Sequence, residues 1–206
     1  MFAYNITFCS KAAGNLIKQV LVLPSESALR ALMKSKCQKL DLNIKIILAL
    51  GEQIAQKESK FKKYVLIFDE MSIKPQLCYY SKSDIIVGFE DLGGLMGCKQ
   101  KIATQLLVLM VRNISGKKKM PIGFFSRNAV ASSYLQSIIE DAIDKLQEYG
   151  IDICDIACDK GANNIGLFSM LRSTVTEPHF IRNGKKIFTS FDSPHLLKSL
   201  TKSDEI

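Results

Sequence analysis

The stretch YVLIF, residues 64–68, constrains the fold more than any other part of this 206-residue chain. Five successive apolar or aromatic residues leave no polar side to face water, which is typical of a strand buried in the middle of a sheet. The stretch ends at Asp69 and Glu70. Because an isolated buried carboxylate is costly, two adjacent acids at the end of such a strand need partners.

The sequence around this strand predicts the rest of a sheet. LCYYSKSDIIVGFED (77–91) is typical of a hairpin that turns at 81–84, and IATQLLVLMVRNI (102–114) and MPIGFFSRN (120–128) predict two strands around the turn SGKKK. Residues 132–150 have apolar residues at helical spacing and end at a glycine. A strand (151–159), a helix (161–173), a strand (185–192) and the start of a helix (194–200) follow. We therefore expect an α/β fold, a mixed sheet with flanking helices.

Residues 1–63 predict a basic helical segment in front of a second domain, 64–206. The first segment has eleven Lys/Arg and four Asp/Glu, a balance of +7, and the remainder has seventeen and sixteen, a balance of +1. Such an excess suits an anionic partner, above all nucleic acid, although a solvated basic surface explains it equally well. Helices are expected over 25–40 and after Asp41. One face of the second carries Leu42, Ile46, Leu50 and Ile54, which either pack on their own domain or pair with a second chain as a homo-oligomer.

The six cysteines have no repeated spacing, and no apolar run approaches the roughly 20 residues that cross a bilayer. The first residues do not have the pattern of a secretory signal. We expect an intracellular protein with reduced thiols and no membrane partner. Cys154 and Cys158 are expected to be buried small side chains rather than zinc ligands.

Three predicted strands end in an aspartate: Asp69, Asp159 and Asp192. Because neighbouring strand ends converge at one edge of such a sheet, these side chains could share a site. Carboxylates held close together repel unless a cation lies between them, and Mg²⁺ or Mn²⁺ prefers such oxygen ligands. Alternatively each aspartate caps the turn or helix that follows, most clearly Asp159. Glu70 is expected on the opposite face of its strand, in a salt bridge or a cap.

Three blocks together are more specific than any one of them. FDEMSIKPQLCYYSKSDIIVGFEDLG (68–93), ACDKGANN (157–164) and FDSPHLLKSL (191–200) resemble, in order and spacing, the RNase H-like catalytic domain of P element-type transposases, which include THAP-domain relatives in animals. The resemblance covers roughly residues 24–198. It implies an RNase H-like fold and a nuclear protein. It also implies DNA cleavage and strand transfer by a DDE-type triad of acids on two Mg²⁺ or Mn²⁺ ions.

The resemblance also implies roles for particular residues. Asp69 and Asp159 would be catalytic metal ligands. Supporting positions would be Asn164, Asp192, His195 and Lys198. In the family the last block leads into a guanine-nucleotide-binding insertion, and the third acid, a glutamate, comes later. The sequence ends at Ile206, so we expect the guanine nucleotide site to be absent and the polypeptide to be nearly inactive by itself.

Two other functions fit the same residues. A domesticated or decayed transposase could bind DNA or a partner without catalysis, and its phosphate contacts would be Lys57, Lys60, Lys62, Lys63, Lys117, Lys118 and Lys119. A stand-alone RNase H-type nuclease would need further acids, for which only Asp91 and Asp155 are available. His179 is expected in a loop.

Overall fold

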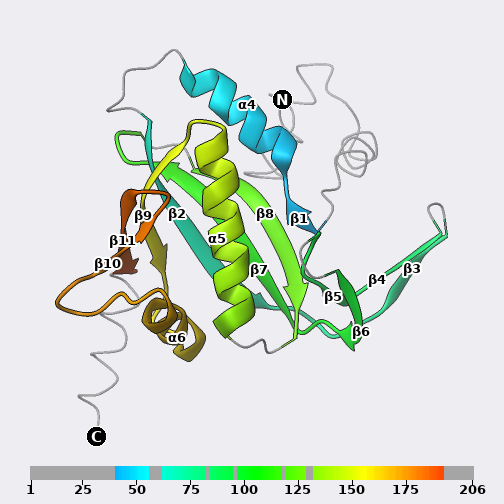
Figure 1. Ribbon diagram of the computed structural model, residues 1–206. Coiled ribbons are helices and arrows are strands. Elements are labelled where there is room, and N and C mark those ends of the chain that lie inside the picture. Colours follow the sequence, from blue (N-terminus) through cyan, green and yellow to red (C-terminus); the bar gives the residue numbers. More distant parts are fainter. Residues whose placement is uncertain are drawn as a thin grey trace, which may run out of the picture. The chain divides into compact units, whose positions relative to one another are not determined.

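The computed structural model describes residues 40–55, 62–81, 84–94, 97–116, 119–128 and 132–192. The helix expected over 194–200, and all but the last residue of the helix expected over 25–40, lie outside these ranges. The described residues form a mixed sheet with three helices, joined to a separate two-stranded hairpin (Figure 1). The prediction of an α/β mixed sheet is confirmed.

The main sheet has the strand order β10-β11-β9-β2-β7-β8-β5-β6, and β1 pairs with β8 as well. Strand β2 lies in the middle, antiparallel to β7 and parallel to β9, and β11 is parallel to β9 on its other side. The strands are β1 (Asp41–Leu42), β2 (Lys63–Ser72), β5 (Phe89–Asp91), β6 (Cys98–Ile102), β7 (Gln105–Asn113), β8 (Lys119–Arg127), β9 (Asp152–Cys158), β10 (His179–Arg182) and β11 (Lys185–Phe191).

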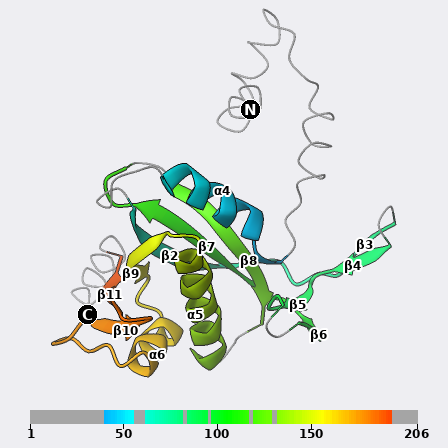
Figure 2. The ribbon, with the colours of Figure 1, turned by 45° about the horizontal axis from the view of Figure 1, so that its top comes forward.

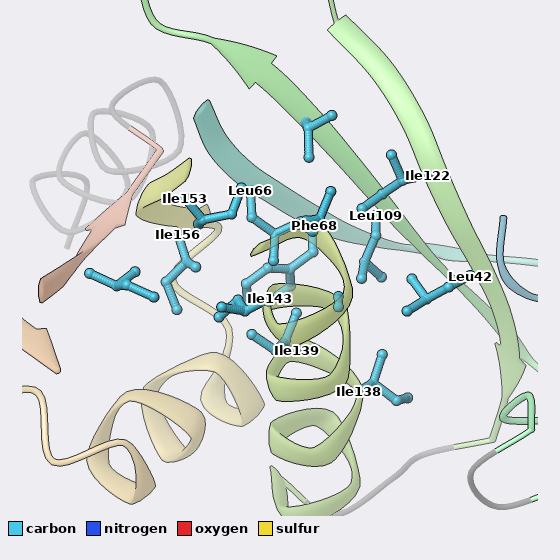
Figure 3. Close-up of a cluster of buried hydrophobic side chains, with 14 of the residues drawn as sticks. Leu42, Leu66, Phe68, Leu109, Ile122, Ile138, Ile139, Ile143, Ile153 and Ile156 are labelled. Carbon is cyan, nitrogen blue, oxygen red and sulfur yellow. The ribbon is translucent and has the colours of Figure 1, made fainter. Parts of the chain in front are cut away.

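The three helices are α4 (Ile44–Ala55), α5 (Ser132–Glu148) and α6 (Ala162–Met170). Figures 1 and 2 show α5 lying along the sheet, with α4 and α6 near its two ends. Their buried side chains join alternate residues of the strands in one hydrophobic cluster, part of which Figure 3 shows. Members that Figure 3 labels include Leu66, Phe68, Leu109, Ile139, Ile143, Ile153 and Ile156.

Alternate residues of β2 have different surroundings, which corrects one expectation. Leu66 and Phe68 are buried on the face that α5 covers, whereas Val65 and Ile67 are only half-buried on the other face. The strand is central, as its apolar run predicts. It is not buried on both faces, because the core helices that the structure describes contribute to a cluster on one face alone.

The apolar stripe of the N-terminal segment packs on its own sheet. Leu50 and Ile54 of α4 are buried in the main cluster, as is Leu42, which lies in β1 rather than in the helix; Ile46 packs against that cluster. Residues 40–55 therefore share a core with the sheet. The division into segments 1–63 and 64–206 stays a prediction.

The hairpin predicted around 81–84 is confirmed as β3 (Cys78–Tyr80) and β4 (Ile85–Val87), which extend away from the main sheet (Figures 1 and 2). The expectation of a loop at His179 is wrong, because this residue begins β10, an edge strand that pairs with β11. No helix among the described residues is long and apolar enough to cross a bilayer.

Candidate active site

The strand register brings three aspartates to the same level. Ala157 of β9 pairs with Ile67 of β2 on one side and with Ser190 of β11 on the other. Two residues after Ala157, Ile67 and Ser190 the sequence has Asp159, Asp69 and Asp192, respectively. Because the three strands are parallel and rise equally per residue, the three aspartates lie at the same level on neighbouring segments of the chain. All three line one open pocket of about 430 Å³.

The pocket lies on the sheet face opposite to α5. Val65, Ile67 and Ala157 form part of its lining. Arg112 and Lys119 line it as well, from β7 and β8. The pocket therefore combines three carboxylates with two cations around a partly apolar floor.

Asp69 does not end its strand, which corrects the sequence prediction. Strand β2 continues to Ser72 beside β7, with Asp69 opposite Val108, but its pairing with β9 stops at Ile67. The carboxylate is exposed where the parallel neighbour ends. Its Oδ1 accepts a hydrogen bond of 2.8 Å from the N–H of Glu70. Its Oδ2 has no hydrogen-bond partner among the residues that the structure describes.

Asp159 stands at the beginning of α6. Its Oδ1 accepts hydrogen bonds from the N–H of Gly161, at 3.2 Å, and from Nδ2 of Asn164, at 2.5 Å. Asn164 is buried, and its Nδ2 also reaches the carbonyl oxygen of Asp159 at 3.3 Å. A Cβ on Gly161 would lie 3.2 Å from Oδ1, so this turn is tightly closed. The alternative expectation that Asp159 caps the helix is wrong, because Gly161 is the N-cap residue of α6 and no side chain in the part of the chain that the structure describes caps it. Oδ1 instead closes the turn before the helix, and Oδ2 keeps no partner among the described residues.

Glu70 points to the other face of β2, as the alternation of a strand predicts. There it forms an ion pair with Arg127, whose side chain is 0% exposed. The expected salt bridge is confirmed.

Comparisons with known proteins agree with this geometry. Residues 39–172 match the family described as TNP-like, RNase H N-terminal domain. The chain belongs to this family. It is 29% identical to human DNA transposase THAP9 over 208 residues, which cover 96% of the chain and 23% of that protein.

A solved structure has a similar fold. The Drosophila P element transposase strand transfer complex matches 98% of this chain and 42% of that chain, with a TM-score of 0.69 and 22% sequence identity. A weaker likeness to the Mos1 mariner paired end complex with Mn has a TM-score of 0.29 and 12% identity. The resemblance to P element-type transposases and the RNase H-like fold are confirmed. The chain spans less than half the length of these relatives.

The remaining predicted site residues of this TNP-like domain are distributed as follows. The N–H of Asp192 donates to the carbonyl oxygen of Cys158 at 2.8 Å, directly after β11. Lys119 lines the pocket, whereas Lys62 and Lys63 lie at the opposite end of β2 from Asp69. Outside the described residues lie His195, Lys198, Lys57, Lys60, Lys117 and Lys118.

The carboxylates also shape the electrostatics of β9. Burial raises the pKa of the Cys158 thiol well above its usual range, and the negative charges of Asp159, Asp155 and Asp69 raise it further. Burial likewise raises the pKa of Asp155, although its Oδ2 accepts a hydrogen bond of 2.8 Å from Ser190 Oγ, which lowers it in part. Both cysteines of this strand are free thiols, Cys158 buried and Cys154 half-buried.

The spare acids of the nuclease hypothesis do not line the pocket. Asp91 lies in β5, at the other side of the sheet, where its Oδ1 accepts a hydrogen bond from the N–H of Gly93. Asp155 lies in β9, four residues before Asp159, and is on the same face of the sheet. In the described part of the chain, no three His, Cys, Asp or Glu side chains gather closely enough to hold a metal ion.

Arg112 is a pocket residue that the sequence did not single out. Its place follows from the pairing with Val65, which puts both side chains on the pocket face. Nothing in the sequence fixes that pairing, although the alternation of apolar residues in β7 does place Arg112 opposite to the buried side.

Proposed function

We propose that this chain carries part of the catalytic domain of a DNA transposase, for metal-dependent DNA cleavage and strand transfer, with Asp69 and Asp159 as ligands of Mg²⁺ or Mn²⁺. The observation that supports this most is the alignment of three aspartates on neighbouring parallel strands in one open pocket. Membership of the TNP-like RNase H family supports the reaction class.

The oxygen atoms in the pocket fit a hard divalent ion. Asp69 and Asp159 each use Oδ1 for a hydrogen bond within the protein, which fixes the carboxylate, and keep Oδ2 without a partner among the described residues. Mg²⁺ is commonly held by one or two such carboxylates together with substrate phosphates. A bound ion would lower the pKa of the attacking water or 3′-hydroxyl group and stabilise the leaving oxygen.

The residues of the chain itself supply position rather than reaction steps. Strands β2 and β9 set the spacing of the two carboxylates, and the buried Asn164 fixes the orientation of Asp159. Asp192 stands beside them in a supporting position. A DNA strand would enter from the open sheet face. Because the proposed substrate is DNA, we expect the protein to act in the nucleus.

Metal binding tests the proposal directly. Mn²⁺ binding to the 206-residue chain, followed by calorimetry and by the electron paramagnetic resonance of free Mn²⁺, should weaken at least about tenfold in Asp69→Asn and in Asp159→Asn, because each loses a charged ligand. Glu52→Gln on α4 removes the same charge from an exposed position and should bind like the wild type. Equal Mn²⁺ affinity in all four proteins would exclude these ligands.

Catalysis by this polypeptide is expected to be weak. Since no group of three metal ligands gathers among the described residues, two carboxylates should hold the ion loosely, and DNA nicking should be slow. Any nicking that depends on Mg²⁺ or Mn²⁺ should disappear in Asp69→Asn. Nicking that survives this substitution would contradict the assignment.

The lack of a group of three metal ligands among the described residues also favours a second function, a non-catalytic module that binds DNA. In that case the basic residues carry binding, through Lys62, Lys63 and Lys119 among the described residues, and affinity should fall steeply with salt while metal has no effect. A homo-oligomer formed through residues 1–63 stays a prediction, and the stripe of α4 is already buried in its own core.

A further inference from the structure

Arg112 and Lys119 form a pair of like charges on the pocket face. They stand directly opposite each other on the antiparallel strands β7 and β8, and both are exposed. Like charges in this position repel and destabilise a sheet. Neither side chain makes an ion pair or a hydrogen bond with a residue that the structure describes, so no described acid offsets their repulsion.

The pair lies at a defined distance from the aspartates. Arg112 is level with Val65 of β2, four residues before Asp69, which corresponds to about 13 Å along the strand. The half-buried Val65 and Ile67 occupy the interval. One pocket thus has carboxylates at one end and two cations at the other, with a partly apolar surface between them.

We infer that Arg112 and Lys119 together bind a backbone phosphate of the DNA strand whose reacting bond lies at Asp69 and Asp159. This inference rests on the proposed function. Arginine forms paired hydrogen bonds with phosphate oxygens, while lysine adds a compact charge. A separation of about 13 Å corresponds to about four base-pair steps measured along the axis of a duplex, so the pair positions the substrate away from the reacting bond.

Recognition through phosphate is independent of base sequence. The pair therefore holds the strand in register across the pocket and does not select a target. An anion between the two cations also removes their mutual repulsion. Neutralising either residue should consequently change binding and stability in opposite directions, which a solvated surface charge would not do.

The test measures binding of a fluorescent duplex to the full 206-residue chain by anisotropy, in EDTA, from about 50 to 200 mM salt. Arg112→Gln and Lys119→Gln should each weaken binding about tenfold at the lowest salt, and the double variant, which no longer neutralises this phosphate, should reduce the slope of log affinity against log salt by about 0.9. Arg112→Lys should keep the wild-type slope. Lys45→Gln, which removes an exposed charge from α4, should leave both unchanged.

Thermal unfolding without DNA is measured on the same proteins. Each neutral variant should melt at or slightly above the temperature of the wild type, because the repulsion is relieved. If Arg112→Gln melts below the wild type, its duplex affinity is set aside, and the affinities of Arg112→Lys and Lys119→Gln are compared with that of the wild type. Wild-type affinity in both neutral variants with a wild-type slope in the double variant, or no binding of the duplex by the wild type at the lowest salt, overturns the inference.

The outcomes separate this inference from the proposed function. If Asp69→Asn loses Mn²⁺ while the Arg112 and Lys119 variants bind DNA like the wild type, the phosphate pair is wrong and the metal site stands. If the pair variants lose DNA binding while Asp69→Asn keeps Mn²⁺ binding, the pair binds phosphate and the catalytic proposal fails.

Discussion

Replacing Glu70 with glutamine should destabilise the protein strongly, because it leaves the buried Arg127 without its counter-charge. The Arg127 side chain is 0% exposed and that of Glu70 18%. The Nε and NH1 atoms of Arg127 have no hydrogen-bond partner among the described residues. Removing one partner of a buried ion pair costs about 3–5 kcal/mol. Since Glu70 keeps some exposure, we expect a loss of about 3 kcal/mol in the free energy of unfolding.

For a chain of this length, 1 kcal/mol shifts the melting temperature by about 2–4 °C. Glu70→Gln should therefore melt about 6–12 °C below the wild type, as measured by circular dichroism and checked by urea denaturation. Glu148→Gln, at an exposed position of α5, is the matched control and should melt within about 1 °C.

The double variant Glu70→Leu with Arg127→Met separates loss of a charge from loss of packing. Apolar replacement of a whole buried pair is often neutral or stabilising, so this protein should recover most or all of the lost stability. If Glu70→Gln melts like its control, then Arg127 does not depend on Glu70 for its burial and the reasoning is refuted. A double variant that is less stable than Glu70→Gln would contradict it as well.

Three further variants test the fold. Gly51→Ala should lower the free energy of unfolding by about 1–3 kcal/mol, measured with urea, because its Cβ would lie 2.6 Å from the carbonyl oxygen of Tyr149. Arg182→Met removes two hydrogen bonds to Asp144 and should cost about 1 kcal/mol at pH 7 for this partly exposed pair. Because Arg182 holds the pKa of Asp144 below its ordinary value, that loss should shrink as the pH falls through this pKa. Asp155→Asn should raise the melting temperature at pH 7, since burial raises the pKa of Asp155 and its charged form costs stability; the difference should vanish once the pH falls below that pKa.

The sequence predicted those elements whose apolar residues recur regularly. Strands β2, β7, β9 and β11, together with α5, have such patterns, and their order alone gives a mixed sheet. It missed β6, which is exposed along most of its length, and β10, a short edge strand. Both depend on pairing with a neighbour rather than on burial, and pairing between distant segments leaves no periodic signal.

The sequence predicted that the three aspartates lie close together, but not the other charged residues of the pocket, whose positions depend on strand register. That Asp69, Asp159 and Asp192 line one pocket follows from the parallel register of β2, β9 and β11, although β2 itself continues past Asp69 to Ser72. The position of Arg112 required the pairing of β7 with β2. The role of Arg127 required burial of a cation, which its sequence context alone does not indicate. Glu70 was the one residue that indicated a buried cation, because a carboxylate next to a buried strand needs a partner.

The alternation of β2 places its core side chains and its pocket side chains on opposite faces of the sheet. Leu66, Phe68 and Glu70 face α5 and belong to the core or its ion pair, while Ile67 and Asp69 face the open pocket. A strand that slipped by one residue would exchange these two sets. The buried Glu70 pair therefore does more than contribute stability. A slip would place the Glu70 carboxylate on the pocket face and separate it from Arg127, so the ion pair, together with the buried Leu66 and Phe68, favours the register on which the aspartates depend.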